Sequence, residues 1–182
     1  MTSIDNNIVK IVEVGPRDGL QNEKTPLTLE QRKALIVDLM QTGLSSIEVG
    51  SCVSAKWVPQ MAQSDVLFAQ LPKDPNIQFS LLTPNLKGFE SARTVGCQEV
   101  AVFTAASESF TQKNINCSID ESLEKFSDVM AAAKASNIKV RGYVSCMVDC
   151  PYEGAIDPQR VANVSKRLLD MGCYEVSLGE TI

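Results

Sequence analysis

The chain has 182 residues, of which 44% are hydrophobic, so it is long enough to bury one sizeable core and does not resemble a disordered protein. Its 17 basic and 22 acidic residues give a net charge of −5, and no stretch concentrates the basic ones. This balance argues against a nucleic-acid partner. No run of about 18 apolar residues occurs, which argues against a membrane span.

Two features of the chain favour a reducing cytoplasm. Residues 1–7 carry neither a basic segment followed by an apolar one nor an Arg-rich amphipathic pattern, so no leader peptide is expected. The six cysteines show no Cys-x-x-Cys spacing, and several lie in apolar runs where a thiol packs as a small hydrophobic group.

Short runs rich in β-branched residues alternate with longer segments of helical periodicity. A capping-box spacing of Thr28 and Gln31 opens the first helix, Pro59 and Pro158 open later ones, and Gly96 and Gly172 end two of them. In chain order we predict strand 8–13, helix 28–42, strand 46–49, helix 59–71, strand 78–82, helix 85–95, strand 99–104, a long loop, helix 118–135, strand 139–146, helix 158–171 and strand 174–178.

Strands joined by helical crossovers run parallel, because an antiparallel neighbour would need only a tight turn. A parallel sheet with both faces covered is either an open doubly wound sheet or a closed (β/α)8 TIM barrel. The chain has no Gly-x-Gly-x-x-Gly turn and no Walker-type sequence, which weakens the case for a nucleotide-binding open sheet. Polar residues follow the carboxyl ends of several strands, where a barrel gathers them at one mouth. We therefore predict a TIM barrel of the α/β class.

Such a barrel has eight strands and about 250 residues. Only six strands and five helices are predicted here, and the sequence stops directly after the sixth strand. We expect residues 1–182 to be the N-terminal part of a single barrel domain that lacks its C-terminal part.

Arg17 and Asp18 follow the first predicted strand, directly after a Gly15-Pro16 turn. An aspartate supplies a hard oxygen ligand suited to Mg²⁺ or Mn²⁺, and a guanidinium can hold an oxygen on which negative charge develops. From residue types alone, a turn with a surface ion pair explains the same two residues. Glu48, at the mouth end of an apolar strand, is costly there unless it is paired.

Seven segments resemble the hydroxymethylglutaryl-CoA lyases, a family within the metal-dependent barrel lyases and acyl-CoA-condensing synthases. They are residues 14–23 (VGPRDGLQNE), 51–61, 82–90, 113–118, 140–146, 150–154 and 171–175, and they span nearly the whole chain. The resemblance implies a (β/α)8 barrel that cleaves 3-hydroxy-3-methylglutaryl-CoA to acetyl-CoA and acetoacetate. It also implies an acyl-CoA substrate and a homodimer in the full-length protein, and it leaves the pathway open between leucine breakdown and ketone-body formation.

The resemblance also implies roles for individual residues. Asp18 would be a ligand of the divalent metal, Mg²⁺ or Mn²⁺, and Arg17 would stabilise the enolate oxygen of the departing acetyl-CoA. Glu48 would hold Arg17 or a metal-bound water, or it is a structural ion-pair partner. Glu180 would join the catalytic residues, although the family usually has an aspartate there. Substrate contacts are expected from residues that packing would explain equally well: Gln21, Tyr143, Ser177 and Thr181.

Lys24, shortly after Arg17 and Asp18, would meet a CoA phosphate or is simply solvated. The chain has no histidine, whereas the family supplies two metal ligands from a His-x-His motif on the seventh strand, and the family's catalytic cysteine lies beyond residue 182. Cys146 and Cys150 are interpreted as packing residues. A related aldolase or condensing synthase and a non-catalytic truncated paralogue remain as alternatives.

Overall fold

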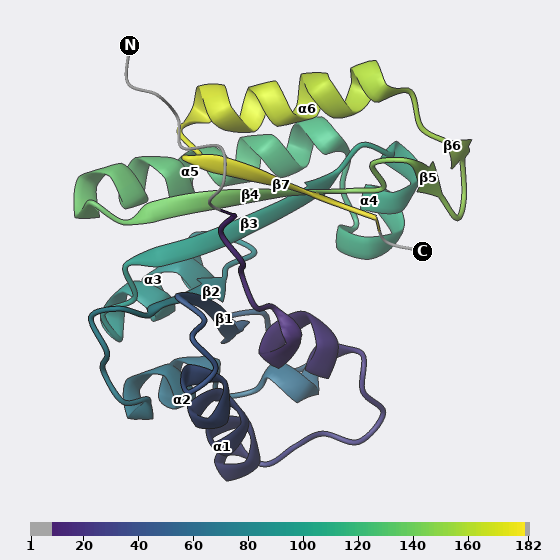
Figure 1. The fold of residues 1–182 in the computed structure, drawn as a ribbon. Helices are drawn as coiled ribbons and strands as arrows, with labels where there is room; N and C mark the ends of the chain where they lie inside the picture. Colours follow the sequence, from purple (N-terminus) through teal and green to yellow (C-terminus); the bar gives the residue numbers. More distant parts are fainter. Residues whose placement is uncertain (1–8, 181–182) are drawn as a thin grey trace.

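The computed structural model describes residues 9–180, and its centre is one parallel sheet (Figure 1). The strands adjoin one another in the order β1 (Ser46–Ser51), β2 (Gln78–Leu82), β3 (Glu99–Ala105), β4 (Lys139–Ser145) and β7 (Glu175–Gly179). Every neighbouring pair is parallel. Because the strands follow one another in chain order without reversal, the arrangement is that of a barrel rather than of a doubly wound sheet. The predicted fold class is confirmed.

The segment before β1 pairs less than predicted. Within the described part of the predicted strand 8–13, only Glu13 is bridged, to Ile47 of β1. The Glu13 N–H donates to the Ser46 carbonyl at 3.0 Å, and its own carbonyl accepts from the Glu48 N–H at 2.8 Å. Residues 9–12 make no ladder, and Val9 and Ile11 are exposed. The prediction of a full strand is therefore wrong for these residues.

Four predicted helices are confirmed as α1 (Leu29–Met40), α3 (Leu86–Thr94), α5 (Ile119–Ser136) and α6 (Pro158–Met171). Thr28 and Gln31 form the predicted capping box of α1. Ser118 forms another with Glu121 at the start of α5. Gly172 ends α6 with a φ of 118°, a left-handed conformation that costs glycine little.

The predicted helix 59–71 is wrong as one element. The segment forms a short 3₁₀ turn, η2 (Pro59–Met61), and then α2 (Ser64–Gln70). Between them Gln63 has a φ of 58°, which interrupts the helical path. The apolar periodicity carries no signal of that interruption.

One helix and one short hairpin lie where the sequence predicted a loop or no element at all. Helix α4 (Glu108–Ile115) begins after Ser107, whose hydroxyl accepts from the Phe110 N–H at 3.1 Å. Strands β5 (Asp149–Cys150) and β6 (Gly154–Ala155) pair as an antiparallel hairpin. In Figure 1, α4 and this hairpin lie together at one end of the molecule. That end is where β3 and β4 finish, so both elements belong to the mouth.

The two faces of the sheet differ in character. Helices α5 and α6 lie side by side over β3, β4 and β7, while α2 lies beside β1 and α1 lies against α2 (Figure 1). On the face toward the helices, the strands contribute apolar side chains to the buried core: Ile47, Val49, Phe79, Leu81, Val100, Val102, Val140 and Val144. Since side chains alternate along a strand, the opposite face carries the intervening residues, among them the polar Glu48, Ser80, Arg141 and Tyr143 and the apolar Leu82, Ala101, Phe103 and Ala105. None of the helices among residues 9–180 is long and apolar enough to cross a membrane.

Candidate active site

A π-helical turn, η1 (Gly15–Gly19), places Arg17 at the mouth. The N–H groups of Arg17 and Asp18 both donate to the Val14 carbonyl, at 3.0 and 2.7 Å. The Gly15 N–H donates to a carboxylate oxygen of Glu13 at 2.6 Å. Because Glu13 is bridged to β1, the turn is anchored to the sheet, and Arg17 is directed inward with only 8% of its surface exposed.

The Arg17 guanidinium lies between two carboxylates. Its Nε donates to Oε1 of Glu48, and its Nη1 donates to Oδ1 of Asp18 at 2.6 Å. Glu48 is fully buried, whereas Asp18 is exposed to solvent. The other oxygen of Glu48 accepts from the Tyr143 hydroxyl at 2.9 Å. Both oxygens of this buried carboxylate therefore have a donor, which offsets the cost of burying it.

The charges of this cluster fix its protonation. Burial disfavours the charged form of Arg17, but the neighbouring Glu48 and Asp18 outweigh it, so the pKa of Arg17 lies above its ordinary value. Burial and the negative charge of Glu48 raise the pKa of Tyr143. At neutral pH the site therefore contains a permanent cation and a neutral phenol that donates a hydrogen bond to Glu48.

The contact between Glu48 and Tyr143 reports the curvature of the sheet. Glu48 is on β1 and Tyr143 is on β4, with β2 and β3 between them. At about 4.8 Å between adjacent strands, a flat sheet would hold these two strands about 14 Å apart. Side chains stand roughly perpendicular to a flat sheet, so their ends would be just as far apart, yet the Tyr143 hydroxyl and the Glu48 carboxylate meet at 2.9 Å. The sheet is therefore curled around the face that carries both residues, as in a barrel.

The remaining predicted site residues stand outside this cluster. Ser177 of β7 is the register partner of Tyr143, so it shares the interior face, but it makes no hydrogen bond to the described residues of the cluster. Gln21 is half-buried and Lys24 is exposed in the segment after η1. Glu180 is exposed, and it accepts from the Val148 N–H at 2.8 Å, which links the end of β7 to the loop after β4. Thr181 lies outside the described residues.

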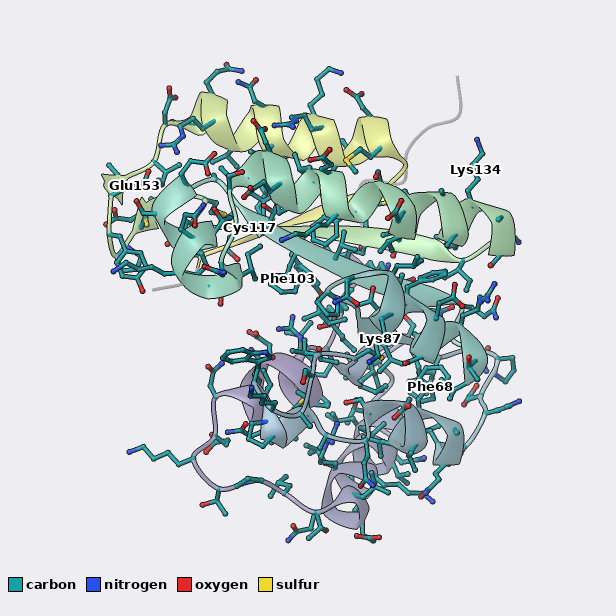
Figure 2. The ribbon with its side chains drawn as sticks, turned by 180° about the vertical axis from the view of Figure 1, so that it is seen from behind. Phe68, Lys87, Phe103, Cys117, Lys134 and Glu153 are labelled. Carbon is teal, nitrogen blue, oxygen red and sulfur yellow. The ribbon has the colours of Figure 1, made fainter. Side chains whose placement is uncertain are left out.

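A second polar cluster at the mouth was not predicted from the sequence. Glu153, in the β5–β6 hairpin, accepts from the Ser107 hydroxyl at 2.9 Å and from the Ser109 N–H at 2.7 Å. Its other oxygen accepts from Arg160 at 3.1 Å. Figure 2 labels Glu153 at the end of the molecule that carries α4. These hydrogen bonds, of which the one from the Ser109 N–H has the largest effect, lower the pKa of Glu153 to about 2.

Asp18 does not form a metal centre with other described residues. One of its oxygens accepts from Arg17, and its side chain is 56% exposed. Within residues 9–180, no group of three or more histidine, cysteine, aspartate or glutamate side chains is placed to hold a metal ion. Among the described residues Asp18 therefore suits a divalent metal only as one ligand of several, a role that its exposed carboxylate permits.

Curated relatives match almost all of this chain. A hydroxymethylglutaryl-CoA lyase from Pseudomonas mevalonii is 56% identical over 96% of it. A cytoplasmic 3-hydroxy-3-methylglutaryl-CoA lyase from Mus musculus and a mitochondrial hydroxymethylglutaryl-CoA lyase from Pongo abelii are each 58% identical over 96% of it. The chain spans 58% of the length of the Pseudomonas mevalonii protein, 51% of the mouse protein and 54% of the Pongo protein.

Solved structures and a family model agree with these relatives. The crystal structure of hydroxymethylglutaryl-CoA lyase from Pseudomonas aeruginosa is 57% identical, with a TM-score of 0.93 over 96% of this chain and 58% of that one. An Acinetobacter baumannii lyase in complex with coenzyme A and 3-methylmalate is 29% identical, with a TM-score of 0.91 over 98% of this chain and 58% of that one. The HMGL-like family model matches residues 8–182. The chain belongs to the HMGL-like family.

Proposed function

We propose that the protein is a carbon–carbon lyase that cleaves 3-hydroxy-3-methylglutaryl-CoA to acetyl-CoA and acetoacetate. The observation that carries this proposal is the buried Arg17 guanidinium, which Glu48 fixes at the mouth end of the sheet. The names of the relatives, at 56–58% identity, support the same reaction.

Arg17 suits the demand of this reaction. Breaking the C2–C3 bond places negative charge on the thioester oxygen of the departing acetyl-CoA. A fixed cation beside that oxygen stabilises the transition state more than the neutral substrate. Among the described residues, carboxylates engage Nε and Nη1 of Arg17, so we assign its Nη2 to the substrate.

Glu48 and Tyr143 prepare Arg17 for that role. The carboxylate holds Nε of Arg17, and the Tyr143 hydroxyl holds the carboxylate. The guanidinium therefore needs little reorganisation when charge develops, which is the source of most electrostatic catalysis. In this proposal Glu48 is a positioning residue, and Tyr143 borders the substrate.

We further propose the remaining binding partners of the site. Asp18 would supply one ligand to Mg²⁺ or Mn²⁺, with the other ligands from outside the described residues. Gln21, Ser177 and Thr181 would contact the substrate, and Glu180 would act from the end of β7. The acyl-CoA substrate is supported by the relatives' names and by the coenzyme A complex of the Acinetobacter protein.

Location and assembly are also proposed. Five of the cysteines are free thiols, namely Cys52, Cys97, Cys117, Cys150 and Cys173, which is compatible with a reducing cytoplasm. A homodimer is proposed for the full-length protein. Fractionation and analytical ultracentrifugation test these two proposals, and a protein found in another compartment or as a monomer would contradict them.

The function is tested with the full-length protein, including whatever its gene encodes after residue 182. We expect acetoacetate to form from 3-hydroxy-3-methylglutaryl-CoA in the presence of Mg²⁺, and Arg17→Gln to slow its formation by about a thousandfold. Arg167→Gln is a matched control, because Arg167 is an exposed arginine paired with Asp120 on the outer helices. No acetoacetate from the unsubstituted protein would refute the proposal, and condensation of acyl-CoA substrates instead would indicate a synthase.

A further inference from the structure

Strand β1 contains a bulge directly after Glu48. The bulge is seen in the register with β2, which pairs Glu48 with Ser80, Gly50 with Leu81 and Ser51 with Leu82. Val49 is thus an extra residue. Because Ser80 and Leu82 are two apart and share a face, the bulge places both Glu48 and Ser51 on the interior face, although they are three apart. A regular strand would direct one of them toward the helices.

Two buried side chains press against the bulge from the helical side. A Cβ atom added to Gly50 would lie 2.5 Å from Oγ of Ser64 and 3.1 Å from Nη2 of Arg32. Such approaches are shorter than van der Waals contact, so the strand comes this close only because residue 50 has no side chain.

Hydrogen bonds hold this pair to the strand and to the loop after it. Oγ of Ser64 accepts from the Ser51 N–H at 3.1 Å and from Nη2 of Arg32 at 2.9 Å, and it donates to the Met61 carbonyl at 2.7 Å. Nη1 of Arg32 donates to the Ala62 carbonyl at 2.7 Å. Arg32 is 3% exposed and Ser64 is 2% exposed. One side of the bulge is thereby fixed to α1 and α2.

Burying the Arg32 guanidinium at this position lowers the stability of the fold. Within residues 9–180 it forms no ion pair, and its Nε is buried without a hydrogen-bond partner. Burial lowers its pKa. An apolar side chain of similar size would fill the space without this desolvation cost. What the guanidinium provides instead is a fixed geometry for Ser64 and for the loop at Ala62.

We propose that Arg32 and Ser64 are positioning residues, which act through the β1 bulge to hold the Glu48 carboxylate between Arg17 and Tyr143. None of the hydrogen bonds of Arg32 and Ser64 reaches Arg17, Glu48 or Tyr143, so we place the effect in the strand backbone at Gly50 and Ser51. The catalytic consequence rests on the proposed lyase function, but the positioning itself does not.

The proposal is tested first by NMR of the full-length protein, through the side-chain Nε–H resonance of Arg17, assigned by its loss in Arg17→Lys. Ser64→Ala removes the acceptor of the Ser51 N–H. We expect it to shift the Arg17 Nε–H resonance and to speed its exchange with water. Ser46→Ala is the matched control: Ser46 is buried at the other end of β1, and its hydroxyl has no hydrogen-bond partner. It should leave the resonance unchanged.

A second variant keeps the test independent of the stability of Ser64→Ala. Gly50→Ala adds a methyl group that must displace Ser64, and we expect it to move the same resonance. An Arg17 resonance unchanged in Ser64→Ala or in Gly50→Ala, in a folded protein, would overturn the proposal. So would an equal change in Ser46→Ala.

Steady-state kinetics then test the catalytic consequence. Misplacing a catalytic group by about 1 Å can cost about a hundredfold in rate, so we expect Ser64→Ala to lower kcat at least tenfold and to leave KM within about twofold. An unchanged kcat in Ser64→Ala would overturn the catalytic part. A protein without lyase activity would refute the proposed function, while the NMR comparison would still decide the positioning.

Discussion

The Tyr143 hydroxyl on β4 donates a hydrogen bond to the Glu48 carboxylate on β1, at 2.9 Å, across an interior bordered by the two strands between them. This bond joins the first and fourth strands of the sheet through side chains alone. It also completes a chain of contacts from β4 through Glu48 to Arg17. The hydrogen bond between Tyr143 and Glu48, which spans the curved sheet, therefore also helps to fix Arg17, the cation of the proposed site.

Tyr143→Phe should destabilise the protein by about 1–2 kcal/mol, because it leaves one oxygen of the buried Glu48 without a donor. Urea denaturation followed by circular dichroism measures this change. Tyr152→Phe is the control, since Tyr152 is 50% exposed. Equal stability of Tyr143→Phe and the unsubstituted protein would show that water replaces the phenol and that the bond contributes nothing.

Glu48→Gln should be more damaging, by about 3–5 kcal/mol, because it leaves the buried Arg17 charge facing a neutral amide. Thermal unfolding measures the loss. Glu124→Gln, at an exposed position of α5, should change little. A Glu48→Gln protein as stable as Glu124→Gln would contradict the assignment of Glu48 as the partner of Arg17.

Glu153 should make stability depend on pH in acid. Its folded-state pKa, about 2, lies below the ordinary value of 4.5, so its contribution is complete above that ordinary value and is lost as pH falls toward 2. Glu153→Gln should therefore lower the melting temperature at pH 7, and the difference from the unsubstituted protein should shrink between about pH 4.5 and pH 2. A difference that is constant over this range would contradict the bonds to Ser107 and Ser109.

Asp18→Asn should weaken binding of Mn²⁺ to the full-length protein at least tenfold, because a neutral amide is a poorer ligand for a hard cation. Isothermal titration calorimetry measures the affinity without reference to activity. Asp170→Asn is the control, since Asp170 is an exposed partner of Lys166 on α6. Equal affinities of the Asp18→Asn and Asp170→Asn proteins would remove Asp18 from the metal site.

Local patterns in the sequence predicted those parts of the fold that local forces decide. The capping box at Thr28, the helix start at Ser118 and the helix-ending glycine at residue 172 lie where the patterns indicate. Helix α4 was missed because its residues show no strong apolar periodicity, and the cap at Ser107 is its main signal. The hairpin of β5 and β6 has two residues in each strand, which is too short for any alternation.

The candidate site was likewise predicted only in part. The strand ends predicted that Arg17, Asp18 and Glu48 would gather at one mouth, and the family resemblance offered Arg17 as one possible partner of Glu48. In the structure Arg17 bonds to both carboxylates. The sequence did not predict that Tyr143 bonds to Glu48, because that contact depends on how strongly the sheet curls. The bulge at Val49 was also missed, because it depends on the packing of Arg32 and Ser64 against Gly50.

The central claim is that Arg17, held by Glu48, is the cation that stabilises the enolate of the departing acetyl-CoA. The most direct measurement is the kcat and KM of acetoacetate formation by the full-length Arg17→Gln protein beside Arg167→Gln. The account predicts that Arg17→Gln lowers kcat by about a thousandfold with little change in KM, because the cation acts on the transition state. A kcat for Arg17→Gln within tenfold of the Arg167→Gln value would contradict it.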